Sequence, residues 1–354
     1  MTNLDILHQR LHNQHIVGTP FDKPADVVQW LGAVQAQDYL GAKWALGLRM
    51  QNATDNVIEQ AFTEGSILRT HVMRPTWHFV TRADIRWMLA LTSPRVKAML
   101  AYMDRRLELD DSLISRSNAV IAKALQGGKQ LTREALGSAL AEAGIVAEGQ
   151  RLLHLVMYAE LDAVVCSGPR LGKQFTYMLL DERAPQARIL DRDEALAELI
   201  RRYYMGHGPA TVQDFAWWSG LTMADTKAGL EMVGSHLSHE VIEDQTYWFS
   251  ELIRPAAEQS QAAFLLPTFD EFLVGFTGFD KSRRGEREAT KNGMFDPPIV
   301  IGGRVTGHWR RTLKKGTANI ELASFAPWTT AESEAISAAA QRYGEFVGMA
   351  VVLS

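Results

Sequence analysis

The chain has 354 residues, of which 46% are apolar and 22% charged, a balance typical of a globular protein with two or three domains. Its one cysteine, Cys166, excludes an internal disulfide and any zinc or iron–sulfur site built from several thiolates, and we expect it to fill the core. No apolar run reaches the roughly 18 residues of a membrane span, and the polar N-terminus lacks a signal-peptide core, so we expect a cytoplasmic protein.

The net charge of −4 hides an uneven distribution. Residues 281–315 contain ten Lys and Arg against three Asp and Glu, whereas the rest of the chain contains 27 against 38. A basic stretch on an acidic scaffold indicates phosphate contacts that are concentrated in one region. On charge alone, a solvated loop explains the stretch equally well.

Residues 1–105 are predicted to form a helical unit that ends in a β-hairpin. An amphipathic segment opens the chain, a second helix begins at Pro24 and continues to Val34, and a third covers residues 56–65. Two β-prone runs, ILRTHVMR and TWHFV, follow around Pro75. Helices followed by a hairpin are the order of a winged helix.

The same order recurs, more clearly, over residues 106–190 and 191–261. Thr132 is placed to cap a helix in the second copy, and Thr211 and Thr222 each precede a helix in the third. Both copies end in β-prone runs that predict a hairpin. We therefore predict three tandem winged helices in a chain that is mainly α with small β-hairpins, an α+β class.

Residues 262–354 depart from this pattern. The run FLLPTFDEFLVGF contains a single acidic pair, Asp270-Glu271, and precedes the basic stretch. Alternating runs around Gly302-Gly303 predict a hairpin, and a further strand and a capped helix follow. We predict a mixed C-terminal unit with a β-sheet, packed on the third winged helix.

Most motifs that identify an enzyme are absent from the sequence. It contains no phosphate-binding GxxxxGK[ST] loop, no GxGxxG that opens a helix, no HExxH and no GxSxG. The ten histidines show no metal-ligand spacing that we regard as diagnostic. We therefore expect an activity without a metal or another cofactor.

Two glutamines follow the helix that begins at Pro24. In a helix, Gln35 and Gln37 would point about 200° apart, whereas in an extended segment they share one side. The pair can act together only if the helix stops near Gln35. The alternative is that the two amides cap backbone groups at the helix end.

Two further segments carry candidate side chains. In the first predicted hairpin, alternation places Thr76 and His78 on one side of the strand, although a half-buried histidine explains His78 as well. In Gly307-His308-Trp309-Arg310-Arg311, an aromatic ring beside two guanidiniums suits backbone phosphates. A core tryptophan flanked by surface arginines explains that motif equally well.

Five segments, VQAQ, MRPTWHFV, GPATVQDFAWWSGL, LLPTFDEFLVGF and IVIGGRVTGHWRR, together resemble the AlkZ/YcaQ-like DNA glycosylases. The resemblance extends from about residue 5 to the C-terminus. It implies three tandem winged helices, a C-terminal β unit and excision of N-alkylated purines, with unhooking of interstrand cross-links by some members. The partner implied is alkylated double-stranded DNA, and we expect a monomer.

The resemblance also assigns roles to particular residues. Gln35 and Gln37 match the catalytic Gln-apolar-Gln signature, with His78 as a third candidate that would orient one of the amides or contact a phosphate. Arg74, Thr76 and Asp270 would line the same cleft. One departure concerns Gln37, because the better-studied branch has Asp there, and a neutral amide cannot act as a general base.

The predicted DNA contacts all lie in the basic stretch of residues 281–315, which includes the hairpin around Gly302-Gly303. They are Lys281, Arg283, Arg284, Arg304, His308, Trp309, Arg310, Arg311, Lys314 and Lys315. The hairpin is our candidate for probing the duplex. A winged-helix DNA-binding protein without enzymatic activity is the alternative function, and only the chemistry at the two glutamines separates it from a glycosylase.

Overall fold

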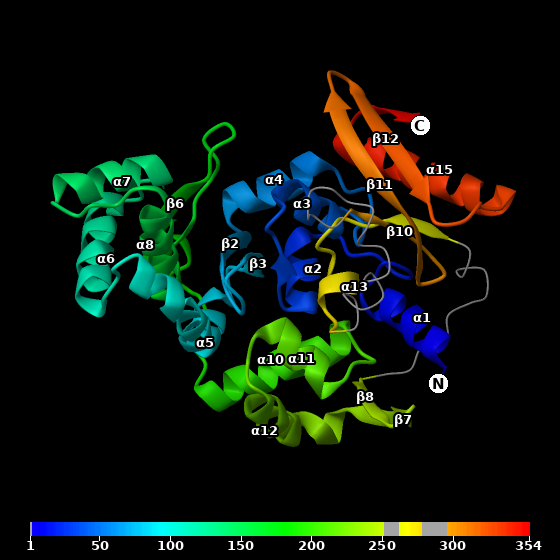
Figure 1. Ribbon diagram of the computed structural model, residues 1–354, viewed down its shortest axis with the longest axis horizontal. Helices are drawn as coiled ribbons and strands as arrows, with labels where there is room; N and C mark the ends of the chain where they lie inside the picture. Colours follow the sequence, from blue (N-terminus) through cyan, green and yellow to red (C-terminus); the bar gives the residue numbers. More distant parts are fainter. Residues whose placement is uncertain (1, 251–261, 278–295) are drawn as a thin grey trace.

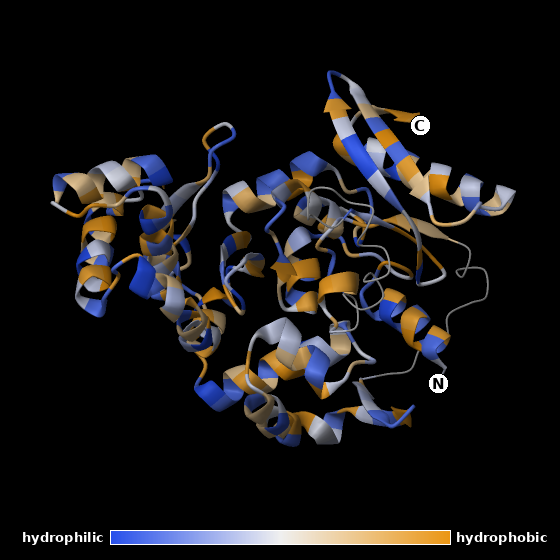
Figure 2. Ribbon diagram, viewed as in Figure 1, coloured by the Kyte–Doolittle hydropathy of each residue, from blue (hydrophilic) through white to orange (hydrophobic). Residues whose placement is uncertain are grey.

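The computed structural model describes residues 2–250, 262–277 and 296–354. Figure 1 shows α6 to α8 at one end of the long axis and the C-terminal sheet with α15 at the other, with the N-terminal elements between them. Most helices carry both hydrophobic and hydrophilic residues, as helices that bury one face do (Figure 2). Among the described helices, none is long and apolar enough to cross a membrane. The predicted α+β class is confirmed.

The N-terminal part combines helices with a small sheet. Its elements are α1 (Asn3–Asn13), α2 (Pro24–Leu31), β1 (Val34–Gln35), α3 (Tyr39–Gly47), α4 (Asp55–Glu64), β2 (Ile67–His71), β3 (Trp77–Thr81) and α5 (Ile85–Arg106). The sheet has the order β1-β3-β2. Helix α2 ends at Leu31, three residues before the predicted end at Val34. The short strand β1 and the helix α3 were not predicted.

Gly32 explains why α2 ends early. Its φ of 79° lies in the region that favours glycine, and a Cβ there would lie 3.3 Å from the ring of Trp218. The chain therefore leaves the helix at Gly32 and enters β1. This change of direction is what places Gln35 in extended backbone.

The second part repeats the order of helices and hairpin that the sequence predicts. It contains α6 (Asp111–Leu125), β4 (Leu131–Thr132), α7 (Arg133–Glu142), α8 (Gly149–Leu161), β5 (Val165–Ser167), β6 (Thr176–Leu179) and α9 (Leu180–Arg183). The predicted cap is present, since the side chain of Thr132 accepts a hydrogen bond from Ala135 N. Cys166 is fully buried, as expected of a core residue.

The third part has the same order again. It contains α10 (Arg192–Gly206), α11 (Val212–Ser219), α12 (Met223–Val233), β7 (Ser238–Ile242) and β8 (Gln245–Phe249). Thr211 and Thr222 form capping boxes at the starts of α11 and α12. The elements agree with the predicted ones, while the assignment of each copy to a winged helix, and the boundaries at residues 105, 190 and 261, stay predictions.

The C-terminal part forms a mixed sheet backed by a helix. It contains β9 (Ala263–Leu265), α13 (Glu271–Val274), β10 (Pro298–Ile301), β11 (Arg304–Lys314), β12 (Thr317–Ser324), α15 (Thr330–Val347) and β13 (Ala350–Leu353). The sheet order is β13-β12-β11-β10-β9. The predicted hairpin at Gly302-Gly303 is present, and both glycines have positive φ.

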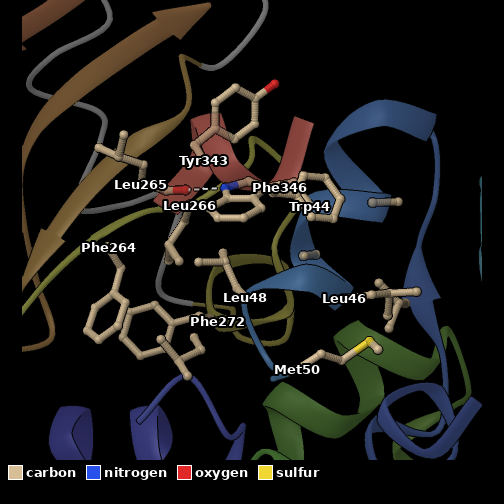
Figure 3. Packing of buried hydrophobic residues seen from close by; sticks show 14 of the residues in the cluster. Trp44, Leu46, Leu48, Met50, Phe264, Leu265, Leu266, Phe272, Tyr343 and Phe346 are labelled. Atoms are coloured by element: carbon tan, nitrogen blue, oxygen red, sulfur yellow. Dashed lines mark hydrogen bonds between the residues drawn. The ribbon is translucent and has the colours of Figure 1, made fainter. Parts of the chain in front are cut away.

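The C-terminal sheet packs on the N-terminal part, whereas the predicted contact with the third part of the chain is made by residues 271–277, where Phe276 shares a core cluster with Tyr203 and Trp218. One core cluster contains Trp44 of α3 together with Phe264, Leu265 and Phe346 from beyond residue 262 (Figure 3). Trp44 Nε1 donates a hydrogen bond to Leu265 O at 2.7 Å. Aromatic side chains from both ends of the chain therefore share one core, which amphipathic patterns within single elements do not reveal.

Candidate active site around Gln35 and Gln37

Residues 34–37 run along the edge of the small N-terminal sheet. In the β1–β3 register Gln35 pairs with His78, and Ala36 N donates to Trp77 O at 2.7 Å. The backbone is thus extended as far as Ala36, as joint action of the two amides requires, and Gln37 follows in a bend. Gln35 is 7% exposed, whereas Gln37 is exposed to solvent.

The side-chain carbonyls of both glutamines contact the same turn of the first hairpin. Arg74 Nη2 donates to Gln35 Oε1 at 2.8 Å. Trp77 N donates to Gln37 Oε1 at 3.4 Å, a longer and weaker contact. Arg74 therefore orients the Gln35 amide, whereas the Gln37 amide is held only weakly and remains accessible from outside.

A fully buried carboxylate lies directly behind Gln35. Glu271 Oε1 accepts the backbone N–H of Gln35 at 2.8 Å. Its other oxygen, Oε2, accepts from Trp218 Nε1 at 2.8 Å and lies 3.3 Å from His207 Nε2. Glu271, His207 and Trp218 were not predicted as site residues, and the acid expected at this place was Asp270, one position earlier.

Electrostatic interactions keep Glu271 ionised. Burial alone raises the pKa of a carboxyl group, but the hydrogen bond and charge of His207, the Gln35 N–H and the charge of Arg74 outweigh it. The pKa of Glu271 is consequently lowered. Burial lowers the pKa of Arg74, and the charge of Glu271 opposes that shift. Gln35 thus lies between a buried anion at its backbone and a cation at its side chain.

His78 is completely buried, so the expectation that it contacts a DNA phosphate is wrong for this structure. Its Nδ1 donates to Thr76 O at 2.9 Å, which leaves Nε2 as the acceptor nitrogen of a neutral ring. Burial and the charge of Arg74 lower the pKa of His78 well below its usual range. Within the described part of the chain, His78 Nε2 and Thr76 Oγ1 are buried without a hydrogen-bond partner.

Asp270 does not line a cleft, contrary to the prediction. It is completely buried and forms a two-pronged ion pair with Arg49, with Nη1–Oδ2 and Nη2–Oδ1 distances of 2.9 and 2.8 Å. It also caps α13 by accepting from Phe272 N. Because a buried guanidinium needs a counter-ion, Asp270 is committed to the core. Its neighbour Glu271 faces Gln35 instead.

The hairpin residues predicted to bind DNA have different surroundings. Trp309 is 1% exposed and donates to Leu266 O at 2.8 Å, so it is a core residue and the prediction of a DNA contact is wrong. Exposed Arg310 is paired with Asp296, and half-buried Arg311 lies 3.3 Å from Asp38, the residue after Gln37. Arg304, Lys314 and Lys315 are exposed, and His308 is half-buried. Lys281, Arg283 and Arg284 lie outside the described residues.

Arg311 therefore brings the C-terminal sheet next to the glutamine motif. A cationic strand that reaches the motif is an arrangement that suits a polyanion. In the described residues, no group of three or more His, Cys, Asp or Glu side chains is placed to hold a metal ion.

The fold and the sequence are both similar to those of a known DNA glycosylase. The solved structure of Streptomyces sahachiroi DNA glycosylase AlkZ superposes with a TM-score of 0.83 at 20% identity and covers all of both chains, which shows that this chain has that fold. The sequence is also 25% identical over 321 residues to the interstrand DNA cross-link repair glycosylase of Streptomyces sahachiroi, with 85% of each protein covered. The model of the family "DNA glycosylase AlkZ-like" matches residues 28–346. The chain belongs to this AlkZ-like DNA glycosylase family, and the resemblance seen in its motifs is confirmed.

Proposed function

We propose that this protein excises N-alkylated purines from double-stranded DNA by hydrolysis, and that cross-linked purines are among its substrates. Membership of the family and the name of the Streptomyces relative, an interstrand cross-link repair glycosylase, support the substrate class. The observation that carries the proposal is the pair of amides, Gln35 and Gln37, tied to one turn with the ionised Glu271 behind them. We further propose a cytoplasmic monomer that needs no cofactor.

The chemistry requires little acid catalysis. Alkylation at N7 gives the purine a positive charge, so the electron pair of the breaking N9–C1′ bond neutralises the leaving base. A water molecule forms the new C1′–O bond and loses a proton to the solvent. The protein has to orient this water and stabilise the oxocarbenium-like sugar, for which preorganised partial negative charge is effective.

The described residues supply that environment. Gln37 Oε1 is exposed and oriented by Trp77, so it is the acceptor best placed to hold the water. Gln35 contributes a second amide, and the buried charge of Glu271 places negative potential behind it. None of the residues described as hydrogen-bonded to the two glutamines is a lysine, which is why we assign the attacking role to water.

The experiment uses a duplex that contains a single 7-methylguanine. Wild-type protein should release the base and leave an abasic site. In Gln37→Ala the rate of base release should fall at least about a hundredfold, as it does when an orienting group is removed, while the affinity for the duplex is unchanged. Gln60→Ala is the matched control, because Gln60 is an exposed glutamine on α4 whose side chain donates to Glu64. Undiminished release by Gln37→Ala, or no release by wild-type protein, overturns the proposal.

A further inference from the structure

A small pocket lies between the first hairpin, β2–β3, and the second helical unit, the part of the chain that contains α6 to α9. Its volume is about 190 Å³, and Arg69 and Trp77 form one wall while Arg133, Phe175 and Tyr177 form the other. The two units are joined beside it, since the backbone N–H of Arg69 donates to Ser167 Oγ at 2.7 Å. Both units therefore contribute to the pocket. One of its residues, Trp77 of the first hairpin, also contacts Gln37 through its backbone N–H.

Arg69 is held in this pocket in a way that leaves part of its guanidinium available. The side chain is 6% exposed, and its Cζ lies 4.2 Å from the ring centroid of Trp77 and 4.4 Å from that of Phe175. Its Nε donates to Ala36 O at 3.0 Å. The two rings cover the faces of the guanidinium, and Nε is hydrogen-bonded to the glutamine motif. The terminal amino groups are therefore the part of Arg69 that can bind a ligand in the pocket.

Arg69 has no carboxylate in an ion pair among the residues that the structure describes. Glu160 is near enough to attract it electrostatically, but that carboxylate is hydrogen-bonded to His71. Burial lowers the pKa of Arg69 to about 10, so the group is charged at neutral pH. A buried cation without a bonded anion is costly unless a ligand supplies the charge.

The opposite wall adds a second cationic element. Helix α7 begins at Arg133, and residues 132–134 line the pocket, so the positive end of the helix lies beside it together with the exposed Arg133 side chain. The side chain of Thr132 caps Ala135 N. Glu134 also lines the pocket, and its negative charge repels an anion. Removing that charge therefore tests whether the group that binds in the pocket is an anion.

We propose that this pocket binds one phosphate group of the DNA backbone close to the nucleotide whose base is removed. A guanidinium edge matches two phosphate oxygens, and the adjacent helix N-terminus donates N–H groups to a third. Through Ala36 and Trp77, the bound phosphate would be connected to the segment that carries both glutamines. This inference rests on the proposed function for the position of the phosphate, but it concerns DNA binding rather than bond cleavage.

The test measures binding to duplexes that carry an abasic-site analogue, so that no cleavage is needed. Single phosphates on either side of the analogue are replaced, one duplex at a time, by uncharged methylphosphonates. We expect wild-type affinity to fall about tenfold at one position, the loss typical of one charge-assisted hydrogen bond. Arg69→Lys and Arg133→Gln should each weaken binding to the unmodified duplex and show little further loss at that same position.

Two further variants sharpen the result. Glu134→Gln should tighten binding to the unmodified duplex because it removes the opposing charge, and Arg116→Gln, an exposed arginine on α6, should keep the full methylphosphonate effect. Arg133 is also exposed, so its variant tests the pocket even if Arg69→Lys folds poorly. If both pocket variants lose affinity equally at every position, or Glu134→Gln weakens binding, the proposal is wrong.

The two proposals can fail separately. A wild-type protein that shows the position-specific loss but releases no 7-methylguanine supports the phosphate pocket and overturns the proposed function. A protein that releases the base while Arg69 and Arg133 variants keep the wild-type methylphosphonate pattern overturns the pocket alone.

Discussion

The carboxylate of Glu271 accepts the backbone N–H of Gln35 at 2.8 Å, and it does so from a completely buried position. The two residues are 236 positions apart in the sequence. The contact joins the C-terminal part of the chain to the glutamine motif in the N-terminal part. It fixes the backbone of Gln35 rather than its side chain. Glu271 therefore acts on the side-chain amide only indirectly, by positioning the residue and by placing a negative charge near it.

We predict that Glu271→Gln lowers kcat for base excision at least about tenfold with little change in KM. The substitution keeps the size of the side chain but removes the charge, and it turns the amide NH2 toward one of the two donors, Gln35 N or Trp218 Nε1. Groups that act only in the transition state change kcat. Single-turnover kinetics on a 7-methylguanine duplex measure this. A variant with wild-type kcat and raised KM would show that Glu271 contributes only to binding.

The buried His78 makes the stability of the folded protein depend on pH. Its pKa is lowered in the folded protein, so in acid the unfolded chain binds a proton that the folded protein does not. The stability that neutral His78 contributes is complete above the unfolded pKa of about 6.5 and falls as the pH drops below it, by up to about 1.4 kcal/mol per pH unit.

We therefore expect His78→Asn to reduce the slope of unfolding free energy against pH in the range just below about pH 6.5. Asparagine retains a donor for Thr76 O but does not titrate. Urea unfolding at several pH values measures the slope, and His236→Asn, at an exposed histidine just before β7, is the control. Identical slopes for wild-type protein and His78→Asn would contradict the neutral, buried state of this ring.

Asp270 and Asp296 provide a comparison between a buried and an exposed ion pair. Asp270→Asn leaves the guanidinium of Arg49 buried without its anion, so we expect a loss of about 3–5 kcal/mol of unfolding free energy. Asp296→Asn breaks a pair with the exposed Arg310 and should change stability little. Chemical denaturation measures both, and equal effects would show that the buried pair is not stabilising in the way we argue.

The exposed cations of β11 should determine part of the salt dependence of DNA binding. Removing Arg310 or Lys314 is expected to lower the slope of log K against log salt by about 0.9 for each phosphate that the side chain neutralises. Fluorescence anisotropy over a range of salt concentrations measures the slope. Trp309→Phe is the internal control, because this buried side chain should leave the slope unchanged. An unchanged slope in an Arg310/Lys314 double variant would exclude the hairpin from the DNA-binding surface.

Local patterns were sufficient to predict most elements. The caps at Thr132, Thr211 and Thr222 depend on interactions within four residues, and the hairpin at Gly302-Gly303 depends on two alternating runs and a turn, so short stretches of sequence contain the relevant information. The position of the two glutamines at the end of a helix was read from local sequence, but their catalytic role was implied by the family resemblance and stays a prediction.

Contacts across the chain could not be predicted in this way. The early end of α2 depends on Gly32 facing Trp218, and the burial of Trp309 depends on a carbonyl group of Leu266. Nothing local distinguishes Asp270 from Glu271, because both are buried and their partners, Arg49 for Asp270 and Gln35 for Glu271, lie far away in the sequence.

The shared core of the two chain ends has a consequence for synthesis on the ribosome. While residues beyond 262 are still inside the ribosome, Trp44 lacks the aromatic neighbours that later cover it, and Gln35 lacks the carboxylate that fixes its backbone. A nascent protein therefore completes the surroundings of Gln35 only after residue 271 has left the ribosome.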